Sequence, residues 1–567
     1  MAYLSTGLGG IGLFLLGMWL ITEGLRLAAG PSLEQLLGRW TSSRLRGLLS
    51  GTFLTALLQS SSAVTVAAIG VVNAGLMTFQ RGVWVIFGSN LGTTLTAWIV
   101  ALIGFKFKVD ALALPIIGIG ALLRVFAPVE RYRSLGMALA GFGILFMGIQ
   151  VLASGFGSLG DQIDLHDARF GLPWMVLLGM VLTALMQSSS AAIAVVLSAV
   201  AAGLVGFADA AAVVIGANVG TTSSALLATI GATSHAKRLA IAHVLFNVVT
   251  AIVALALLTP LLKLVMLIGE DAGHAGDWTT LLALFHTLFN LLGVLVMWPV
   301  EPYMSRWLLG RFVEHEAEPT RLRFLDRNVA SLPDAAAVAL VRELEPLIVE
   351  AATSVQGLPQ PDGQRRLQSQ QRHRHLAAIS DFFVDATRYP ISTEVAGLFS
   401  RGWRIQHNLM YVEETVQRLD ELATALTRSE DFEQVREPVS SWFDSVGEQL
   451  KGVLGGTGGT LDFIVLAPAY EQVKLKLLQL ALSGKISRAS LDTALQMCSL
   501  SRRFSEQWLR ALNHWRQMRE ETDGSRRPEA TAEAEAVDSP VVAAEAPAVP
   551  VDESAGQNKQ AESTRIP

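Results

Sequence analysis

Residues 55–63 read TALLQSSSA, and residues 183–191, which lie 128 positions further along the chain, read TALMQSSSA. The similarity continues without a gap to GSNLGTTLTA at residues 88–97 and GANVGTTSSA at residues 216–225, so that 20 of the 43 aligned positions are identical. The shared residues include one Gln, three Ser, one Asn and two Thr inside otherwise apolar segments. Many membrane transporters build a substrate site at the interface of two such repeats. The duplication therefore indicates a transporter.

The composition divides the chain into two regions. Overall, 51% of the 567 residues are hydrophobic and 16% are charged, but most of the charge follows residue 310. Before that point, apolar runs of membrane-spanning length lie near residues 8–29, 134–155, 172–203, 239–268 and 279–300. A transmembrane helix needs about 20 mostly apolar residues. Residues 1–310 are therefore predicted to form a membrane domain, and no basic cluster is dense enough to suggest nucleic acid binding.

Each repeat is longer than its matching core. The string GLFLLG at residues 12–17 precedes the first copy, and GILFMG at residues 143–148 precedes the second. We therefore expect repeat 1 at about residues 8–104 and repeat 2 at about residues 139–231. The N-terminal apolar run lacks a basic leader and a cleavage site, so it is interpreted as a first membrane helix and not as a signal peptide.

The charged loops indicate an orientation, because short cytoplasmic loops are enriched in Lys and Arg. The connection before the first QSSSA is basic and its counterpart before the second is acidic, which favours inverted repeats that enter the membrane from opposite sides. This scheme places the N-terminus outside and the C-terminal region in the cytoplasm, with Lys106 and Lys108 as exceptions. The basic residues are Arg26, Arg39, Arg44, Arg46, Arg124, Arg131, Arg133, Lys237, Arg238, Arg306 and Arg311, and the acidic ones are Asp161, Asp164, Asp167, Glu270, Asp271 and Asp277.

The C-terminal region has the character of a soluble protein. Residues 311–335 are predicted to be a linker, and residues 336–523 show the apolar spacing of amphipathic helices and are predicted to form a helical bundle. Residues 524–567 are rich in Ala, Glu, Pro and Ser without an aromatic residue, which is typical of a disordered tail. The single cysteine, Cys498, excludes an intrachain disulfide and is expected to be an inert core residue.

The two QSSSA segments cannot be ordinary lipid-facing helix. Successive helical positions point about 100° apart, so four polar side chains in a row require a broken backbone that lines an enclosed cavity. Gly51 and Gly70 are expected to ease such a break in the first copy. Hydroxyl and amide N–H groups suit a small oxyanion, and their oxygens suit a hard cation such as Na⁺. The alternative is helix packing, since Ser is common where membrane helices approach closely.

The segments from Gly88 to Thr94 and from Gly216 to Thr222 follow the pattern G-x-N-x-G-T-T. We expect a helix break whose N–H groups meet an anion, or alternatively a close helix contact through glycine. The segments are not P-loops, because the ending G-K-[ST] is absent.

Two further polar pairs share the pattern H-x-L-F-N, namely His243 with Asn247 and His286 with Asn290. They lie in the predicted closing helices at residues 237–309, and each pair shares one helix face. Hydrogen bonds between helices are the favoured role, with a proton step as the alternative. Glu23 and Arg26 are expected to form a salt bridge, and no carboxylate lies centrally in the apolar runs, which argues against a carboxylate proton relay.

These paired motifs resemble the type II sodium-phosphate cotransporter family in its bacterial form, which often carries a C-terminal domain similar to PhoU. The resemblance covers residues 1–310, and by pattern alone residues 330–520. It implies an all-α polytopic membrane protein with inverted repeats and broken or re-entrant helices, plus a cytoplasmic helical bundle. It assigns the family's substrate and sodium region to Gln59, Ser60, Ser61 and Ser62, and to Gln187, Ser188, Ser189 and Ser190. The G-x-N-x-G-T-T segments add Asn90, Thr93, Thr94, Asn218, Thr221 and Thr222 as candidate binding residues. PhoU-like proteins can bind metal through E/D-x-x-x-D motifs, but no convincing repeat of that motif occurs here, so no metal ligand is predicted.

The favoured function is sodium-coupled symport of inorganic phosphate across the cytoplasmic membrane by alternating access. The expected partners are phosphate, Na⁺ as coupling ion, the lipid bilayer, and a second copy or a regulatory protein at the bundle; no other cofactor and no catalytic residue is expected. The alternative is a membrane-anchored regulator that senses phosphate status without transport. An enzyme is disfavoured, because no nucleophile, base and orienting residue occur together.

Overall fold

The computed structural model describes residues 2–29, 41–104, 110–160, 171–230, 232–312, 322–389, 391–455 and 463–524. Within these ranges the chain is helical and contains no strand, so the predicted all-α class is confirmed. Several predictions concern residues outside the described ranges: Arg39, Lys106, Lys108, Asp161, Asp164, Asp167, residues 313–321 of the linker and the tail from residue 525. By its contacts the chain forms one compact unit over residues 1–519.

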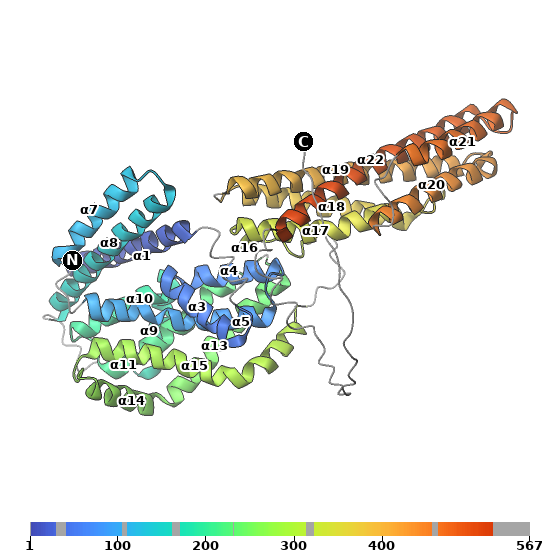
Figure 1. The fold of residues 1–567 in the computed structure, drawn as a ribbon. Coiled ribbons are helices and arrows are strands. Elements are labelled where there is room, and N and C mark those ends of the chain that lie inside the picture. The colour runs from blue at the N-terminus through green and yellow to red at the C-terminus, as the bar shows by residue number, and fades with distance from the viewer. Residues whose placement is uncertain are drawn as a thin grey trace, which may run out of the picture. The chain divides into compact units, whose positions relative to one another are not determined.

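The helices of the first 310 residues carry the labels of Figure 1. In chain order they are α1 (Ala2–Ala29), α3 (Arg44–Leu58), α4 (Ser61–Asn73), α5 (Phe79–Gly92), α6 (Thr94–Ile99), a short π-helix (Val100–Gly104), α7 (Asp110–Phe126), α8 (Glu130–Gly160), α9 (Leu172–Met186), α10 (Ser189–Ala201), α11 (Phe207–Gly220), α12 (Thr222–Leu227), α13 (Ser234–Ala256), α14 (Leu258–Asp271) and α15 (Trp278–Leu309).

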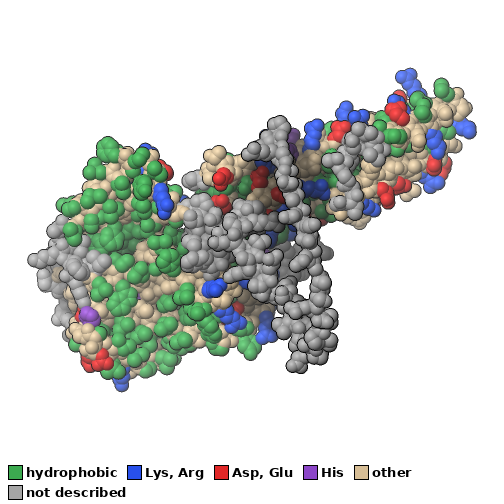
Figure 2. Space-filling model, viewed as in Figure 1, with side chains coloured by type: hydrophobic (Ala, Val, Ile, Leu, Met, Phe, Trp, Pro, Cys, Tyr) green, Lys and Arg blue, Asp and Glu red, His purple; other side chains and the backbone are tan. Residues whose placement is uncertain are grey.

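This part of the chain has the length and apolar character of a multi-pass membrane protein. Six described helical spans are long and apolar enough to cross a membrane. Figure 2 shows hydrophobic side chains over most of the visible surface of these helices, whereas Lys, Arg, Asp and Glu are frequent on the C-terminal helices. The six spans are Ser5–Ala29, Phe79–Leu102, Glu130–Gly157, Phe207–Leu227, Ser234–Ala256 and Trp278–Leu309.

The duplication in sequence is a duplication of structure. Four helices of the first copy, α3 to α6, begin and end 128 residues before four helices of the second copy, α9 to α12. The leading strings fall in α1 and α8, which pack against each other. Among the described residues, each repeat thus contains one long helix followed by four shorter ones that break at equivalent residues.

The glycines of the G-x-N-x-G-T-T segments allow close packing within each repeat. A Cβ atom on Gly88 would lie 2.0 Å from the carbonyl oxygen of Leu48, and one on Gly216 would lie 1.9 Å from that of Val176. The α3–α5 and α9–α11 pairs could not approach so closely with a larger residue at these positions. These two glycines therefore make the close helix contact that the sequence analysis gave as the alternative.

The C-terminal helices form a bundle (Figure 1). Its buried hydrophobic core also includes Ala74, which caps the end of α4. They are α16 (Arg327–Ala330), α17 (Pro333–Thr353), α18 (Gly363–Ala386), α19 (Thr393–Thr427), α20 (Phe432–Leu454), α21 (Phe463–Leu482) and α22 (Arg488–Gly524). Cys498 is buried in this core, as expected, and burial raises the pKa of its thiol to about 12.

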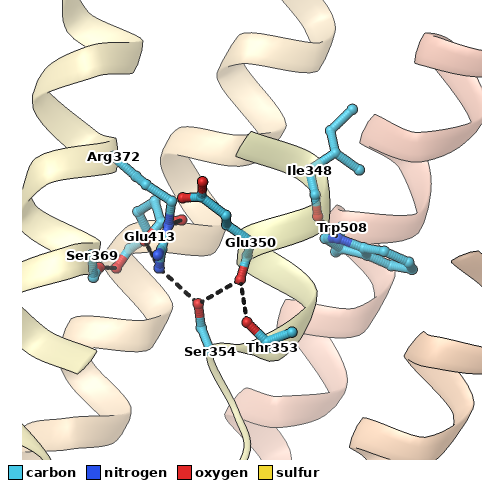
Figure 3. A network of polar contacts seen from close by, with 8 residues as sticks. All are labelled: Ile348, Glu350, Thr353, Ser354, Ser369, Arg372, Glu413 and Trp508. Carbon is cyan, nitrogen blue, oxygen red and sulfur yellow. Dashed lines mark hydrogen bonds and ion pairs between the residues drawn. The ribbon is translucent and has the colours of Figure 1, made fainter. Parts of the chain in front are cut away.

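Ion pairs are buried between α17, α18 and α19. Arg372 on α18 donates two hydrogen bonds to the carboxylate of Glu413 on α19, at 2.7 and 3.0 Å, and a third to Ser354 at 2.7 Å (Figure 3). Nearby, His375 contacts Glu343 at 2.7 Å, and the Glu343 carboxylate also accepts hydrogen bonds from backbone amides at residues 323 and 324. The network therefore fixes the described end of the linker to α17.

A second carboxylate joins α16 to the first repeat. Asp326 caps α16 through the amide of Val329 at 2.9 Å, and its other oxygen accepts hydrogen bonds from Asn73 Nδ2 (3.3 Å) and from the amide of Thr233 (3.2 Å). The hydroxyl of Thr233 in turn donates to Asn73 Oδ1 at 3.0 Å. Asn73 ends α4 and Thr233 caps α13, so the residue that starts the bundle holds one end of two membrane helices. The equivalent of Asn73 in repeat 2 is Ala201, and this contact is therefore specific to repeat 1.

Candidate substrate and ion site

Each QSSSA segment breaks its helix at the glutamine. Gln59 and Gln187 end α3 and α9 in the left-handed region, with φ of 55° and 52°. Such φ values are uncommon for a residue other than glycine. The predicted break is thus present in both copies, but Gly51 and Gly70 do not form it. Gly51 packs against Val85 and Gly70 against Leu332.

The serine after each glutamine caps the next helix. The Ser60 hydroxyl accepts from the amide of Ala63 at 3.2 Å, and the Ser188 hydroxyl accepts from the amide of Ala191 at the same distance. The amides of Val64 and Ala192 bond to the carbonyls of these two serines.

Since a helix start has four amides without an intrahelical partner, the first-turn amides that remain at each site belong to the next two serines, Ser61 and Ser62 in one copy and Ser189 and Ser190 in the other. A helix start with hydroxyls and free amides favours an anion.

Both glutamine side chains are held in one orientation by a residue from the end of the same repeat. Thr96 donates to Oε1 of Gln59 at 2.7 Å, and Ser224, its equivalent, donates to Oε1 of Gln187 at 2.9 Å. The amide nitrogens of both glutamines donate back to the preceding helix turn. Thr96 and Ser224 were not among the predicted site residues, although their hydroxyls lie in register in the duplicated stretch.

The two copies differ in their surroundings. Ser62 is exposed and Gln59 half-buried in the first copy, whereas Ser189 and Ser190 are buried and Gln187 is exposed in the second. Helix α4 packs against α13, α16 and α17, and α10 packs against α1, α6, α8 and α15. The side-chain hydrogen bonds that join the predicted site residues to other side chains lie within one repeat or between a repeat and a closing helix.

The threonines of the two G-T-T segments bond to their own helices. Thr93 and Thr221 donate to the carbonyls of Asn90 and Asn218 at 2.6 Å, and Thr94 and Thr222 donate to carbonyls three residues back. The backbone at Thr93 and Thr221 keeps right-handed helical angles. The helix is therefore only slightly interrupted at this point.

The two asparagines of the G-x-N motifs meet the closing helices. Asn90 accepts a hydrogen bond from His243 Nε2 at 3.3 Å, and Asn218 Nδ2 donates to Oδ1 of Asn290 at 2.9 Å. Asn247 donates to the hydroxyl of Thr221 at 3.1 Å. Hydrogen bonding between helices, the favoured prediction for the H-x-L-F-N strings, is confirmed for these pairs.

The histidine of the second string differs. His286 is fully buried, and neither of its ring nitrogens has a hydrogen-bond partner among the described residues.

One buried carboxylate was not predicted from the sequence. Glu301 on α15 is 1% exposed, accepts from the Ser305 hydroxyl at 2.6 Å and lies 3.5 Å from the guanidinium of Arg44. It lies just beyond the apolar run at residues 279–300, in the part of α15 that continues to Leu309. The expected pair of Glu23 and Arg26 is confirmed, at 2.8 Å.

Comparisons with known proteins agree with these features. The profile of the family described as Na+/Pi-cotransporter matches residues 13–154 and 173–290. The uncharacterized protein YqeW of Bacillus subtilis (strain 168) is 33% identical over 291 residues, which are 51% of this chain and 91% of that protein.

Two relatives have names that mention phosphate. YjbB of Escherichia coli (strain K12), whose name proposes inorganic phosphate export, is 26% identical over 59% of this chain and 61% of its own length. The human sodium-dependent phosphate transport protein 2B is 32% identical over 97 residues, or 17% of this chain and 14% of its own. No solved structure matches the chain. Family and relatives together indicate phosphate transport, and the chain belongs to the Na+/Pi-cotransporter family.

Proposed function

We propose that the chain is a secondary active transporter that moves inorganic phosphate together with Na⁺ by alternating access. The observation that carries the proposal is the pair of broken helices at Gln59 and Gln187, each followed by a serine cap and a helix start. The polar groups lie at equivalent positions of two repeats, as in transporters that bind substrate between repeats. Serine hydroxyls and amides from these helix starts bind the phosphate oxygens, and glutamine, serine and threonine oxygens bind Na⁺.

Phosphate and Na⁺ need opposite partial charges, and the broken helices supply both. The amides at the starts of α4 and α10 carry partial positive charge. The carbonyl groups that end α3 and α9 carry partial negative charge at the same break, so that both ligands fit close to one another. Binding both ligands at one break couples their affinities, which is the requirement for symport.

Flux measurements in proteoliposomes test this function. Labelled phosphate flux is measured with a Na⁺ gradient in each direction and with K⁺ in place of Na⁺. Symport predicts that phosphate moves in the direction of the Na⁺ gradient and stops without Na⁺. Phosphate flux that ignores the Na⁺ gradient contradicts the coupling, and absence of phosphate flux under every gradient contradicts transport.

We further propose a cytoplasmic-membrane location with inverted repeats and a cytoplasmic, PhoU-like bundle that regulates transport. Support comes from the basic residues near α3 and the acidic residues at the end of α14. In a Cys498→Ser background, cysteines at Arg46 and Glu270 should react with impermeant reagents from opposite sides. Labelling of both from one side would contradict this orientation.

A further inference from the structure

The closing helices α13 and α15 occupy equivalent places. Each begins with a side-chain cap, from Thr233 and Asp277, and the histidine of its H-x-L-F-N string follows the cap by ten and nine residues, respectively. Helix α13 contacts α4, α5, α11 and α12, and α15 contacts α10, α11, α5 and α6. When each repeat helix in the first set is replaced by its counterpart in the other repeat, 128 residues away, the first set of neighbours becomes the second. The two closing helices are therefore related by the same pseudo-symmetry as the repeats.

Their hydrogen bonds do not obey that symmetry. Asn90 in repeat 1 bonds to the histidine of α13, His243, whereas Asn218 in repeat 2 bonds to the asparagine of α15, Asn290. Histidine and asparagine are four residues apart, so the contact differs by about one helical turn, or about 5.4 Å along the axis. The two halves of the membrane domain are therefore in different registers against their closing helices.

The side-chain atoms without a partner follow the same asymmetry. In the half formed by repeat 1 and α13, Asn90 Nδ2 and Asn247 Oδ1 are buried and unpaired. Their equivalents in the half formed by repeat 2 and α15, Asn218 Nδ2 and Asn290 Oδ1, are hydrogen-bonded to each other.

For the histidines, the unpaired side chain lies in the other half. His243 has a partner in Asn90, but both ring nitrogens of its equivalent, His286, are buried and unpaired. A neutral imidazole has one donor and one acceptor, and leaving both unmet in the protein interior lowers stability. Nδ1 is unpaired in both histidines. Each other unpaired group of the G-x-N and H-x-L-F-N motifs in one half corresponds to a paired group in the other half.

We propose that the two halves exchange these registers during transport, an inference that rests on the proposed alternating-access function. In the exchanged state, His286 bonds to Asn218, and Asn90 Nδ2 donates to Asn247 Oδ1. Asn290 then donates to Thr93, as Asn247 now does to Thr221, and the ring of His243 is left unpaired.

The exchange keeps the number of hydrogen bonds constant, so the two states lie close in free energy, as interconverting states must. A shift of one element past another by one turn is a known form of switching. His286 is accordingly a positioning residue for the exchanged state. It is unpaired in the present state because it bonds to Asn218 only in the exchanged state.

Replacing His286 by leucine separates this proposal from a packing role. His286→Leu removes two unpaired polar atoms from the present state, so the thermal unfolding temperature of the full-length protein should rise. The same change removes a bond of the exchanged state, so phosphate flux should fall about tenfold or more. His286→Gln, whose amide can donate and accept, should restore much of the flux.

The matched control is Thr250→Val. The Thr250 hydroxyl is also buried and unpaired on α13, but its counterpart on α15 is Gly293, so it takes no part in the exchange. This variant should gain stability and keep normal flux. Normal flux in His286→Leu would overturn the proposal, and so would equal losses of flux in both variants.

The reciprocal variant, His243→Leu, tests the exchange without relying on flux. It removes the bond to Asn90, so its structure in lipid nanodiscs should show His286 bonded to Asn218 and Asn90 bonded to Asn247. A structure that keeps the Asn218–Asn290 bond with His286 unpaired would refute the exchange. If the wild-type protein moves no phosphate, the proposed function fails, and this structure still decides the exchange.

Discussion

The hydroxyl of Thr96 donates a 2.7 Å hydrogen bond to Oε1 of Gln59, and Ser224 stands in the same relation to Gln187 at 2.9 Å. Each glutamine ends a helix with left-handed backbone angles. The bond connects this strained residue to the far end of its own repeat, 37 positions along the chain. The glutamine amide is therefore held in one orientation.

Removing this hydroxyl should loosen the glutamine without removing any other site group. We expect Thr96→Val to raise the phosphate or Na⁺ concentration for half-maximal flux about three- to tenfold, because one hydrogen bond contributes about 0.5–1.5 kcal/mol. Thr96→Ser, which keeps the hydroxyl, is the control and should behave like the wild type. Unchanged half-maximal concentrations in Thr96→Val would show that Gln59 needs no support from α6.

The break itself could be predicted from sequence, but its geometry could not. Four consecutive polar residues in an apolar run excluded a regular lipid-facing helix, and both copies are interrupted at that point. Glycine was the expected source of flexibility, yet the left-handed residue is glutamine. A glutamine adopts this conformation because distant groups hold it there, and no local pattern in the sequence reveals them.

The hydrogen-bond partners between helices could not be predicted from the sequence either. The H-x-L-F-N strings identified His243, Asn247, His286 and Asn290 as interhelical, and the periodicity placed each pair on one face. Which of the two residues meets the G-x-N asparagine depends on the register of packed helices, which differs between the halves. Glu301 was missed because it lies just beyond the apolar run at residues 279–300.

Asp326 should stabilise the start of the bundle and the end of α4 together. Asp326→Ala removes a helix cap and two further hydrogen bonds, which we expect to cost about 1–3 kcal/mol. Hydrogen exchange measured by mass spectrometry should accelerate in α16 and in the last turn of α4. Asn73→Ala, which introduces the residue of repeat 2, should accelerate exchange in α4 alone. Unchanged exchange at α4 in both variants would contradict the junction.

The buried pair of Arg372 and Glu413 should be sensitive to the loss of one partner. Glu413→Leu leaves a buried guanidinium without its carboxylate, and we expect a loss of about 3–5 kcal/mol in the unfolding free energy of the bundle. The double variant Arg372→Met with Glu413→Leu should recover most of that loss, because no charge remains unpaired. Denaturant unfolding of the full-length variants measures both values. Equal destabilisation in the single and double variants would argue against this account.

The pKa of the Cys498 thiol, raised by burial to about 12 from an ordinary value of 9.0, makes stability depend on pH. The unfolded chain loses the thiol proton more readily than the folded protein. The stabilising contribution is therefore complete below pH 9 and declines as the pH rises towards 12.

At pH 8 the folded protein should resist iodoacetamide, and alkylation should track unfolding, since this is the only cysteine in the chain. Mass spectrometry over a denaturant series checks this, and alkylation of the folded protein at the rate of an exposed thiol would contradict burial.

The most direct test of the account compares phosphate flux in proteoliposomes that contain wild-type protein, Gln59→Ala, Gln187→Ala or the double variant. Hydrogen bonds to charged groups contribute about 1.5–3 kcal/mol. Each single substitution should therefore raise the phosphate or Na⁺ concentration for half-maximal flux about tenfold or more. Thermal unfolding of the same samples shows whether the protein remains intact. A binding role predicts that the variants remain folded and that the phosphate or Na⁺ concentration for half-maximal flux rises. Reduced stability together with normal concentrations in both single variants would contradict a binding role and assign QSSSA to helix packing.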